Sequence, residues 1–425
     1  MTKICAVIKQ KSYPPTQWRK NNYTMNNSKL IGSTLIIAGT TIGAGMLALP
    51  LASAGLGFST SLVLMLAIWS LMAFTALLML ELHQHAQHDA TLHTLAQQFL
   101  GTKGKWLATA AMLFLFYALC AAYIAGGGSQ FNQKLHSWFD LDTSQEVATT
   151  IFTLLIAAVV TFGTHSVDKV NRLLFGAKII AMALVLFFLS PSVRLDNLVS
   201  MPVQQGLIIS ALPVIFTSFG FHGSIPAVVK YLELDVKAVK RALVVGSSIP
   251  LVVYILWQVS TLGVLSQAEL ATSSNLSLFI NSLSETVHQG AFSNAVSIFA
   301  DLALLTSFLG VSLGLFEFLA DSLSKKSASI NRFGVAVVTF TPPLGFALFY
   351  PQGFITALGY AAIALVILAV FLPVAMVDKA RKQLAYDECY QVRGGNVTLV
   401  MATLFGIMII VTQIAISLGI LPALG

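Results

Sequence analysis

Two short glycine-rich stretches are places where the polypeptide backbone itself could bind a ligand. The first runs from Gly39 to Pro50, as Gly-Thr-Thr-Ile-Gly-Ala-Gly-Met-Leu-Ala-Leu-Pro. The second runs from Phe216 to Pro226, as Phe-Thr-Ser-Phe-Gly-Phe-His-Gly-Ser-Ile-Pro. Glycine lowers helix propensity by about 1 kcal/mol and proline by about 3 kcal/mol. We therefore expect each stretch to interrupt a helix and to leave backbone N–H and C=O groups open.

A pair of interrupted helices suits a zwitterionic ligand, because helix amino ends attract anions and helix carboxyl ends attract cations. In the first stretch, Gly43, Ala44 and Gly45 lack bulky side chains, so their N–H groups are candidates to bind a carboxylate. Carbonyls near Phe219 and Gly220 are candidates to bind an ammonium. An apolar remainder of the pocket would accept an aromatic side chain. The other candidate substrate-binding residues are Thr40, Thr41, Tyr123, Phe216, Phe221 and His222.

The composition indicates that these stretches lie in a membrane. The chain is 56% hydrophobic and 10% charged, whereas about 25% of the residues in a soluble domain are charged. A hydrocarbon core of about 30 Å needs about 20 apolar residues for each helical crossing. We therefore predict an all-α integral membrane protein with eleven transmembrane helices, at approximately 30–54, 58–82, 106–125, 147–162, 173–189, 207–231, 242–265, 292–319, 335–350, 354–377 and 397–420.

The positive charges predict the orientation of these helices. With the amino terminus inside, all of the 24 Lys and Arg residues except Lys134 and Arg194 fall in or beside cytoplasmic regions. Cytoplasmic loops retain positive charge, so we predict a cytoplasmic amino terminus and a periplasmic carboxyl terminus. The net charge of +7 is then a sign of topology and does not indicate a nucleic-acid partner. The first 28 residues contain no apolar signal core, and we expect them to form a cytoplasmic tail.

The two interrupted helices occupy matching places in two successive blocks of five helices. We expect the blocks to span residues 29–200 and 201–378, after a tail at 1–28 and before a loop and accessory helix at 379–425. Because five is odd, the second block must be inverted relative to the first. Small residues also allow close helix packing, but paired interruptions in inverted halves point to a transporter's central binding site.

Ionisable residues inside the predicted helices are further candidates, because charges at membrane depth are costly and usually mark a pathway. His222 could bind a substrate hydroxyl or titrate, or instead bond a neighbouring helix. Lys178 and Asp301 are candidates for ion coupling. Lys178 could instead extend to the cytoplasmic surface, and Asp301 could be paired. Glu317 lies near a helix end, where we expect it to be solvated.

The motifs of several other protein classes are missing. The chain has no H-E-x-x-H, G-x-S-x-G or Walker A sequence, which removes support for a metalloprotease, hydrolase or ATP-driven pump. The cysteines lack C-x-x-C spacing and lie far apart, at Cys5, Cys120 and Cys389. One cluster of histidines matches no structural zinc pattern; its members are His83, His85, His88 and His93. We therefore expect no metal site and no cofactor.

The two glycine-rich stretches closely resemble those of the bacterial hydroxy/aromatic amino acid permeases. Two further stretches support the resemblance, Ala300 to Gly310 and Phe349 to Phe354, and the similarity runs from about Ser28 to the carboxyl end. The resemblance implies a LeuT-type fold with two inverted five-helix repeats, broken helices 1 and 6, and one accessory helix. It also implies a protein of the bacterial inner membrane that imports an aromatic amino acid.

The resemblance also suggests where a coupling ion would bind. In related transporters a sodium ion lies between the first and eighth helices, where Thr306 and Ser307 fall in this chain. In some proton-driven relatives a lysine of the fifth helix takes that role, and Lys178 is the matching residue type. The resemblance therefore favours Lys178, and a proton, for coupling.

These observations predict a secondary active transporter that imports tyrosine or another aromatic amino acid by proton symport and alternating access. We expect lipid around it and no obligate protein partner. A sodium-coupled carrier of the same fold is the nearest alternative, and an uncoupled sensor or channel is another. An intramembrane enzyme has only His222 and Asp301 in its favour.

Overall fold

The computed structural model describes residues 27–87, 89–162, 164–200, 207–273, 275–286, 290–324, 331–383 and 389–422. Most of the predicted cytoplasmic tail and one histidine of the cluster, His88, lie outside these residues. Within them, ten helices are long and apolar enough to cross a membrane, and the bent pair α2–α3 makes an eleventh. The predicted count of eleven spans is therefore confirmed by length and composition.

The spans follow one another along the chain. The first five are α2 with α3, α4, α5, α6 and α7, at Asn27–Thr41 with Gly45–Ala52, Phe58–His83, Leu92–Phe139, Gln145–Phe162 and Thr164–Leu189. The sixth consists of α9, α10, η3 and α11, at Leu207–Ser210, Leu212–Ser218, His222–Ser224 and Ile225–Tyr231. The last five are α12, α15, α16, α17 to α18, and α19, at Val236–Val264, Gly290–Ser324, Arg332–Phe349, Phe354–Gln383 and Gly395–Ser417.

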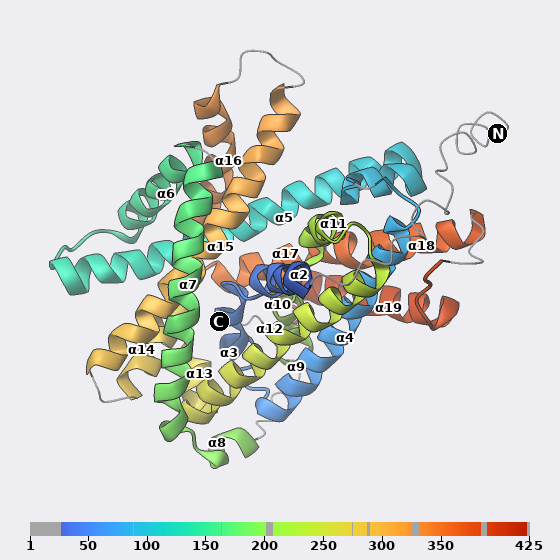
Figure 1. Cartoon of the computed structure of the whole chain (residues 1–425). Helices are drawn as coiled ribbons and strands as arrows, with labels where there is room; N and C mark the ends of the chain where they lie inside the picture. The colour runs from blue at the N-terminus through green and yellow to red at the C-terminus, as the bar shows by residue number, and fades with distance from the viewer. Residues whose placement is uncertain are drawn as a thin grey trace.

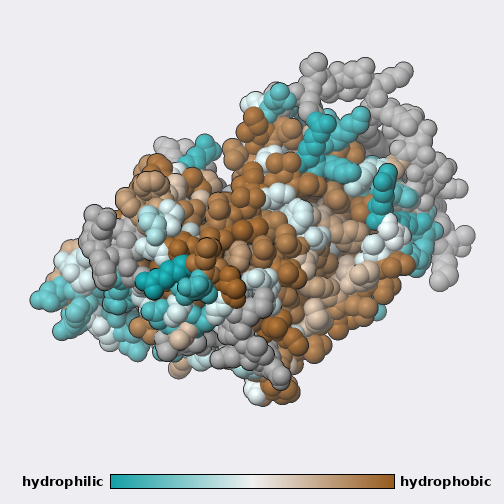
Figure 2. Space-filling model, turned by 90° about the horizontal axis from the view of Figure 1, so that it is seen from below, coloured by the Kyte–Doolittle hydropathy of each residue, from teal (hydrophilic) through white to brown (hydrophobic). Residues whose placement is uncertain are grey.

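Short helices lie between some of the spans. They are η2, α8, α13 and α14, at Ser190–Ser192, Leu195–Val199, Gln267–Thr272 and Leu276–Thr286. The interrupted elements α2, α3 and α10 occupy the centre of the molecule, and longer helices surround them (Figure 1). Figure 2 shows hydrophobic residues across the middle of one face and hydrophilic residues towards two ends, as expected for a protein surrounded by lipid.

The third span is much longer than its apolar run predicts. The sequence indicates a helix over residues 106–125, but α5 has 48 residues, with a kink at Gly101, where φ is 77°. At 1.5 Å per residue the part of α5 after this kink, residues 102–139, is about 57 Å long, nearly twice the hydrocarbon thickness. Polar residues at both of its ends continue the helix where it leaves the apolar region, and hydropathy alone gives no sign of this extension.

A buried ion pair fastens the segment before α19 to α4. Glu81 of α4 is fully buried and accepts two hydrogen bonds from Arg381 of α18, at 2.7 and 2.8 Å. The backbone N–H of Val392 donates to the same carboxylate at 2.9 Å, and Arg381 donates to the Val392 carbonyl at 3.1 Å. Both oxygens of the Glu81 carboxylate are thereby paired, which is the condition under which a buried ion pair is tolerated.

We expect Glu81→Ala to lower the free energy of unfolding by about 3 kcal/mol, because the mostly buried Arg381 would lose its counter-charge. The measurement is thermal or denaturant unfolding of the purified protein in detergent. Asp378→Ala is the control, since Asp378 pairs with Lys382 on the exposed side of α18. Such an exposed pair contributes about 0.5 kcal/mol. Equal losses from the two variants would contradict the assignment.

Candidate functional site

The first predicted interruption is present. α2 ends at Thr41, α3 begins at Gly45, and their axes are bent by 51°. Pro50 lies inside α3 and not at the break. The glycines therefore set the position of the break, and the proline follows one turn later.

The second interruption is also present, and it is the wider of the two. α10 ends at Ser218, the chain is non-helical over Phe219 to Phe221, and α11 begins at Ile225 after a short 3-10 turn. Pro226 falls in the first turn of α11, where a missing N–H costs nothing because that group has no helical partner.

The two breaks face one another at close range. The Ser218 hydroxyl lies 3.0 Å from the Gly45 carbonyl oxygen, and a Cβ atom added to Gly45 would lie 3.1 Å from the Cα of Ser218. A glycine is therefore needed at position 45 for α3 to pack this closely on α10.

Tyr254 of α12 joins the two breaks. Its side chain is fully buried, and its hydroxyl oxygen lies 2.6 Å from the Thr41 carbonyl and 2.9 Å from the Ser218 carbonyl. The hydroxyl has one proton to donate, so these two carbonyls share it. Both are the terminal carbonyls of a helix, which otherwise lack a partner.

Several backbone groups at the breaks have no protein partner in the described residues, among them two donors and two acceptors. Within the part of the chain that the structure describes, the N–H groups of Gly43 and Gly45 donate to no protein atom, and the carbonyl oxygens of Phe219 and Gly220 accept from none. Two open donors at the amino end of α3 thus accompany two open acceptors after the carboxyl end of α10. This arrangement is complementary to a carboxylate and an ammonium on one small ligand.

Side chains of α7 and α15 hold the first break from its other side. Ser307 accepts a hydrogen bond from the Ala44 N–H at 2.9 Å. Lys178 donates to the Ile42 carbonyl at 2.9 Å and to the Thr306 hydroxyl at 3.2 Å. The predicted coupling residues Lys178, Thr306 and Ser307 are therefore brought together.

Lys178 is enclosed by protein. Its side chain is 2% exposed, so it does not extend to the cytoplasmic surface. The ammonium lies 4.6 Å from the centre of the Phe175 ring, in a cation–π contact. None of the carboxylates in the described residues forms an ion pair with it. Its charge is balanced by a carbonyl, a hydroxyl and an aromatic ring, a weaker set of partners than a carboxylate.

The predicted aromatic residues are buried around the breaks. Phe216, Phe219 and Phe221 are at most 1% exposed, and Tyr123, beside Ser307, is 7% exposed. The Phe219 ring meets the Tyr254 ring edge-on, with centroids 5.1 Å apart. The surroundings of the breaks are therefore largely apolar.

His222 forms the contact with a neighbouring helix that the sequence left as an alternative. One ring nitrogen, Nε2, lies 2.9 Å from the Thr75 hydroxyl of α4. The other, Nδ1, is buried and has no protein partner. His222 therefore links the second break to α4 and retains one polar atom that is still open.

Some candidates lie apart from this group. The Thr40 side chain is exposed and bonds to its own helix, and Thr41 contributes its carbonyl to the site, since its hydroxyl bonds to Ile37. Asp301 forms an ion pair with Lys134 of α5 and does not reach Lys178, while Glu317 is exposed. The structure shows no group of His, Cys, Asp and Glu suited to a metal among the residues that it describes.

Two residues of α12 at this site were not predicted from the sequence. Besides Tyr254, Gln258 is fully buried and donates to the hydroxyls of Ser53 and Ser61, at 2.6 and 2.9 Å. A polar stripe at helical spacing in an otherwise apolar span was the available signal, and its members are Ser247, Tyr254, Gln258 and Thr261.

We expect Tyr254→Phe to destabilise the protein by about 1–3 kcal/mol, because it leaves two buried carbonyls without a donor. Tyr117→Phe is the control: its hydroxyl donates to one carbonyl, that of Val338 on α16, at a less buried position. Unfolding of both variants in detergent gives the comparison. A smaller loss for Tyr254→Phe would show that the bridge contributes little.

Comparison with known proteins identifies the family. Residues 26–413 match the tryptophan/tyrosine permease family. The chain is 46% identical over 93% of its length to the tyrosine-specific transport system 1 of Haemophilus influenzae, of which it covers 99%. It is 43% identical over 94% of its length to transport system 2 of that organism, also covering 99%. A tryptophan-specific transport protein of H. influenzae is 36% identical over 92% of this chain, with 96% of that protein covered.

A solved structure supports the fold. The manganese transporter of Eremococcus coleocola, a protein with a LeuT-like fold, aligns with a TM-score of 0.60 over 93% of this chain and 88% of its own. At 14% identity this likeness concerns the fold alone. From the family match and the extent of these similarities, the chain belongs to the tryptophan/tyrosine permease family and is a bacterial multi-pass membrane transporter, not an enzyme.

Proposed function

We propose that this protein imports tyrosine, or a closely related aromatic amino acid, across the bacterial inner membrane by proton symport. The observation that carries the proposal is the set of open backbone groups at the facing breaks. The N–H groups of Gly43 and Gly45 bind the carboxylate, and the carbonyls of Phe219 and Gly220 bind the ammonium. The buried phenylalanines receive the aromatic ring, and the names of two relatives that are 46% and 43% identical to this chain favour tyrosine.

His222 and Tyr123 are the polar side chains in this arrangement that suit a substrate hydroxyl. The open Nδ1 of His222 is buried and has no protein partner. Tyr123 lies beside Ser307, which holds the first break. A phenol that bonds one of these atoms distinguishes tyrosine from phenylalanine, because an unpaired buried polar group is costly.

Lys178 is the residue that carries the coupling proton in this proposal. When charged, it donates to the Ile42 carbonyl inside the first break and to Thr306 of α15. When neutral, it loses the charge-assisted part of both bonds. The protonation state of one side chain thus changes how firmly the break is held against α15, which is how an ion can bias two transport conformations.

A sodium ion is disfavoured by the position of the same lysine. The oxygens that sodium would use between the first and eighth spans are the Ile42 carbonyl and the Thr306 hydroxyl, and the Lys178 ammonium already binds both. Two cations within about 4 Å repel strongly where the dielectric constant is low.

Transport then follows by alternating access, with the amino terminus in the cytoplasm and the carboxyl terminus in the periplasm. Substrate and proton bind from the periplasm, the two broken helices move relative to α7 and α15, and both are released inside. The hydrogen bonds from Lys178 and to Ser307 cross the boundary between these two groups of helices.

We expect purified protein in liposomes to accumulate tyrosine under an inward proton gradient and not under a sodium gradient alone. Lys178→Met should reduce proton-driven accumulation roughly ten-fold or more, because a hydrogen bond to a charged group contributes about 1.5–3 kcal/mol. Lys240→Met is the control, since Lys240 is exposed and packs over the Tyr390 ring. Accumulation by Lys178→Met at the wild-type level, or accumulation driven by sodium, would reject this coupling.

Gly45→Ala tests the binding site itself. Its Cβ would press on the Ser218 backbone, and such overpacking costs about 1–3 kcal/mol. We expect uptake and binding of labelled tyrosine to weaken roughly 5- to 150-fold, the equivalent of that energy. Gly223→Ala, at the second break and with open space around it, should retain most of its activity. Wild-type affinity in Gly45→Ala would remove the glycine from the site.

A further inference from the structure

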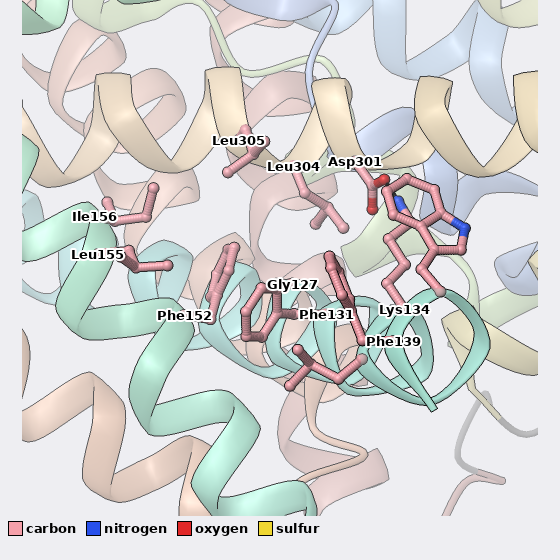
Figure 3. A pocket seen from close by; sticks show the side chains of 12 residues that line it. Gly127, Phe131, Lys134, Phe139, Phe152, Leu155, Ile156, Asp301, Leu304 and Leu305 are labelled. Atoms are coloured by element: carbon pink, nitrogen blue, oxygen red, sulfur yellow. Dashed lines mark ion pairs between the residues drawn. The ribbon is translucent and has the colours of Figure 1, made fainter. Parts of the chain in front are cut away.

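An apolar groove lies between α5, α6 and α15, apart from the two breaks. It has a volume of about 350 Å³. The walls are formed mainly by Phe131, Phe152, Leu155, Ile156, Leu304 and Leu305. Figure 3 shows Lys134 and Asp301 together at one end of the groove, with Leu155 and Ile156 towards the other. The Lys134–Asp301 ion pair therefore forms the polar end of an otherwise apolar groove.

The polar end lies near the boundary of the membrane. The part of α5 after its kink, residues 102–139, is about 57 Å long at 1.5 Å per residue, so it extends beyond the hydrocarbon core, and Lys134 is five residues from its end at Phe139. The Lys134 ammonium lies 5.2 Å from the centre of the Trp138 ring, and tryptophan is enriched at membrane–water interfaces. This depth is that of the lipid headgroups.

The other end of the groove reaches the hydrocarbon region. Leu155 and Ile156 are ten and eleven residues from the start of α6 at Gln145, which places them about 15 Å deeper at 1.5 Å per residue. The rim is open to the surroundings, since Phe139 is 65%, Trp138 58% and Leu155 56% exposed. The groove thus runs from headgroup depth to acyl-chain depth and opens sideways towards lipid.

We propose that this groove binds a phospholipid whose headgroup carries both a phosphate and a primary ammonium, namely phosphatidylethanolamine. The phosphate contacts Lys134, the ammonium contacts Asp301, and an acyl chain lies along Phe131 and Phe152. The protein pair has no net charge, so it matches a zwitterionic head better than an anionic one, which Asp301 repels. A quaternary ammonium has no N–H to donate to a carboxylate, which separates this lipid from phosphatidylcholine.

The floor of the groove is connected to the helix that holds the transport site. Gly127 of α5 lets the Phe152 ring lie against the backbone, since a Cβ there would lie 2.4 Å from that ring. Phe152 stacks on Phe308 of α15, with centroids 5.8 Å apart. Asp301 belongs to α15 as well, so the bound lipid contacts the helix that carries Ser307.

The test is native mass spectrometry of the full-length protein purified in detergent and supplied with equal amounts of phosphatidylethanolamine, phosphatidylcholine and phosphatidylglycerol. We expect one retained phosphatidylethanolamine, at least ten-fold more populated than either other lipid. Lys134→Leu with Asp301→Leu should abolish this preference. The double change leaves no unpaired buried charge, so folding is preserved. Lys134→Asp with Asp301→Lys is the matched control, and it should keep the preference because both charges remain.

Three results would overturn the proposal. One is equal retention of the three lipids by the wild type. Another is a preference that survives in the double-leucine variant. The third concerns a free aromatic amino acid, which also carries an ammonium and an anionic group: if L-tyrosine displaces the bound lipid one for one, the groove is a second amino acid site. None of these measurements uses transport, so their outcome is separate from that of the coupling and binding experiments.

Discussion

The structure depends on the cost of leaving backbone polar groups without partners inside a membrane. Each unpaired N–H or C=O in hydrocarbon costs several kcal/mol, so a span is normally a continuous helix. The first and sixth spans are interrupted, and their interruptions face one another. Neighbouring side chains form hydrogen bonds with several of the backbone groups that the interruptions leave without helical partners. The Tyr254 hydroxyl donates to the terminal carbonyls of α2 and α10, and the Ser307 hydroxyl accepts from the N–H of Ala44. Among the groups that stay open within the described residues are the N–H groups of Gly43 and Gly45 and the carbonyls of Phe219 and Gly220.

The partners of the first break come from two different sets of helices. Tyr254 and Gln258 belong to α12, which packs on α2 and α4, and Gln258 joins the carboxyl end of α3 to α4 through Ser53 and Ser61. Lys178 and Ser307 belong to α7 and α15, which pack closely on each other. The break is therefore the place where two groups of helices share hydrogen bonds, and a change in one of these bonds affects both.

The ionisable residues show that burial alone does not define a role. Lys178, Glu81 and Asp301 all lie within long helices, but their partners differ. Glu81 accepts hydrogen bonds from Arg381 and from a backbone N–H, so it holds α4 to α18 and to the segment before α19. Asp301 has a single lysine partner at the end of a groove. Lys178 lies at the centre of the molecule and has only neutral partners. Of these three residues, Lys178 is therefore the one whose charge would be most affected by a small movement of the break.

Composition, charge distribution and glycine placement determined the membrane class, the eleven spans and both interruptions, because these are local properties of the chain and of lipid as a solvent. The spacing of Gly43 and Gly45 also located the open N–H groups. Only the tertiary structure decided which side chains meet there. Tyr254, Glu81 with Arg381, and Lys134 with Asp301 join helices distant in sequence, and no local pattern encodes such pairings. The full length of α5 could not be predicted from the sequence either, because hydropathy does not identify the parts of a helix that lie outside the lipid.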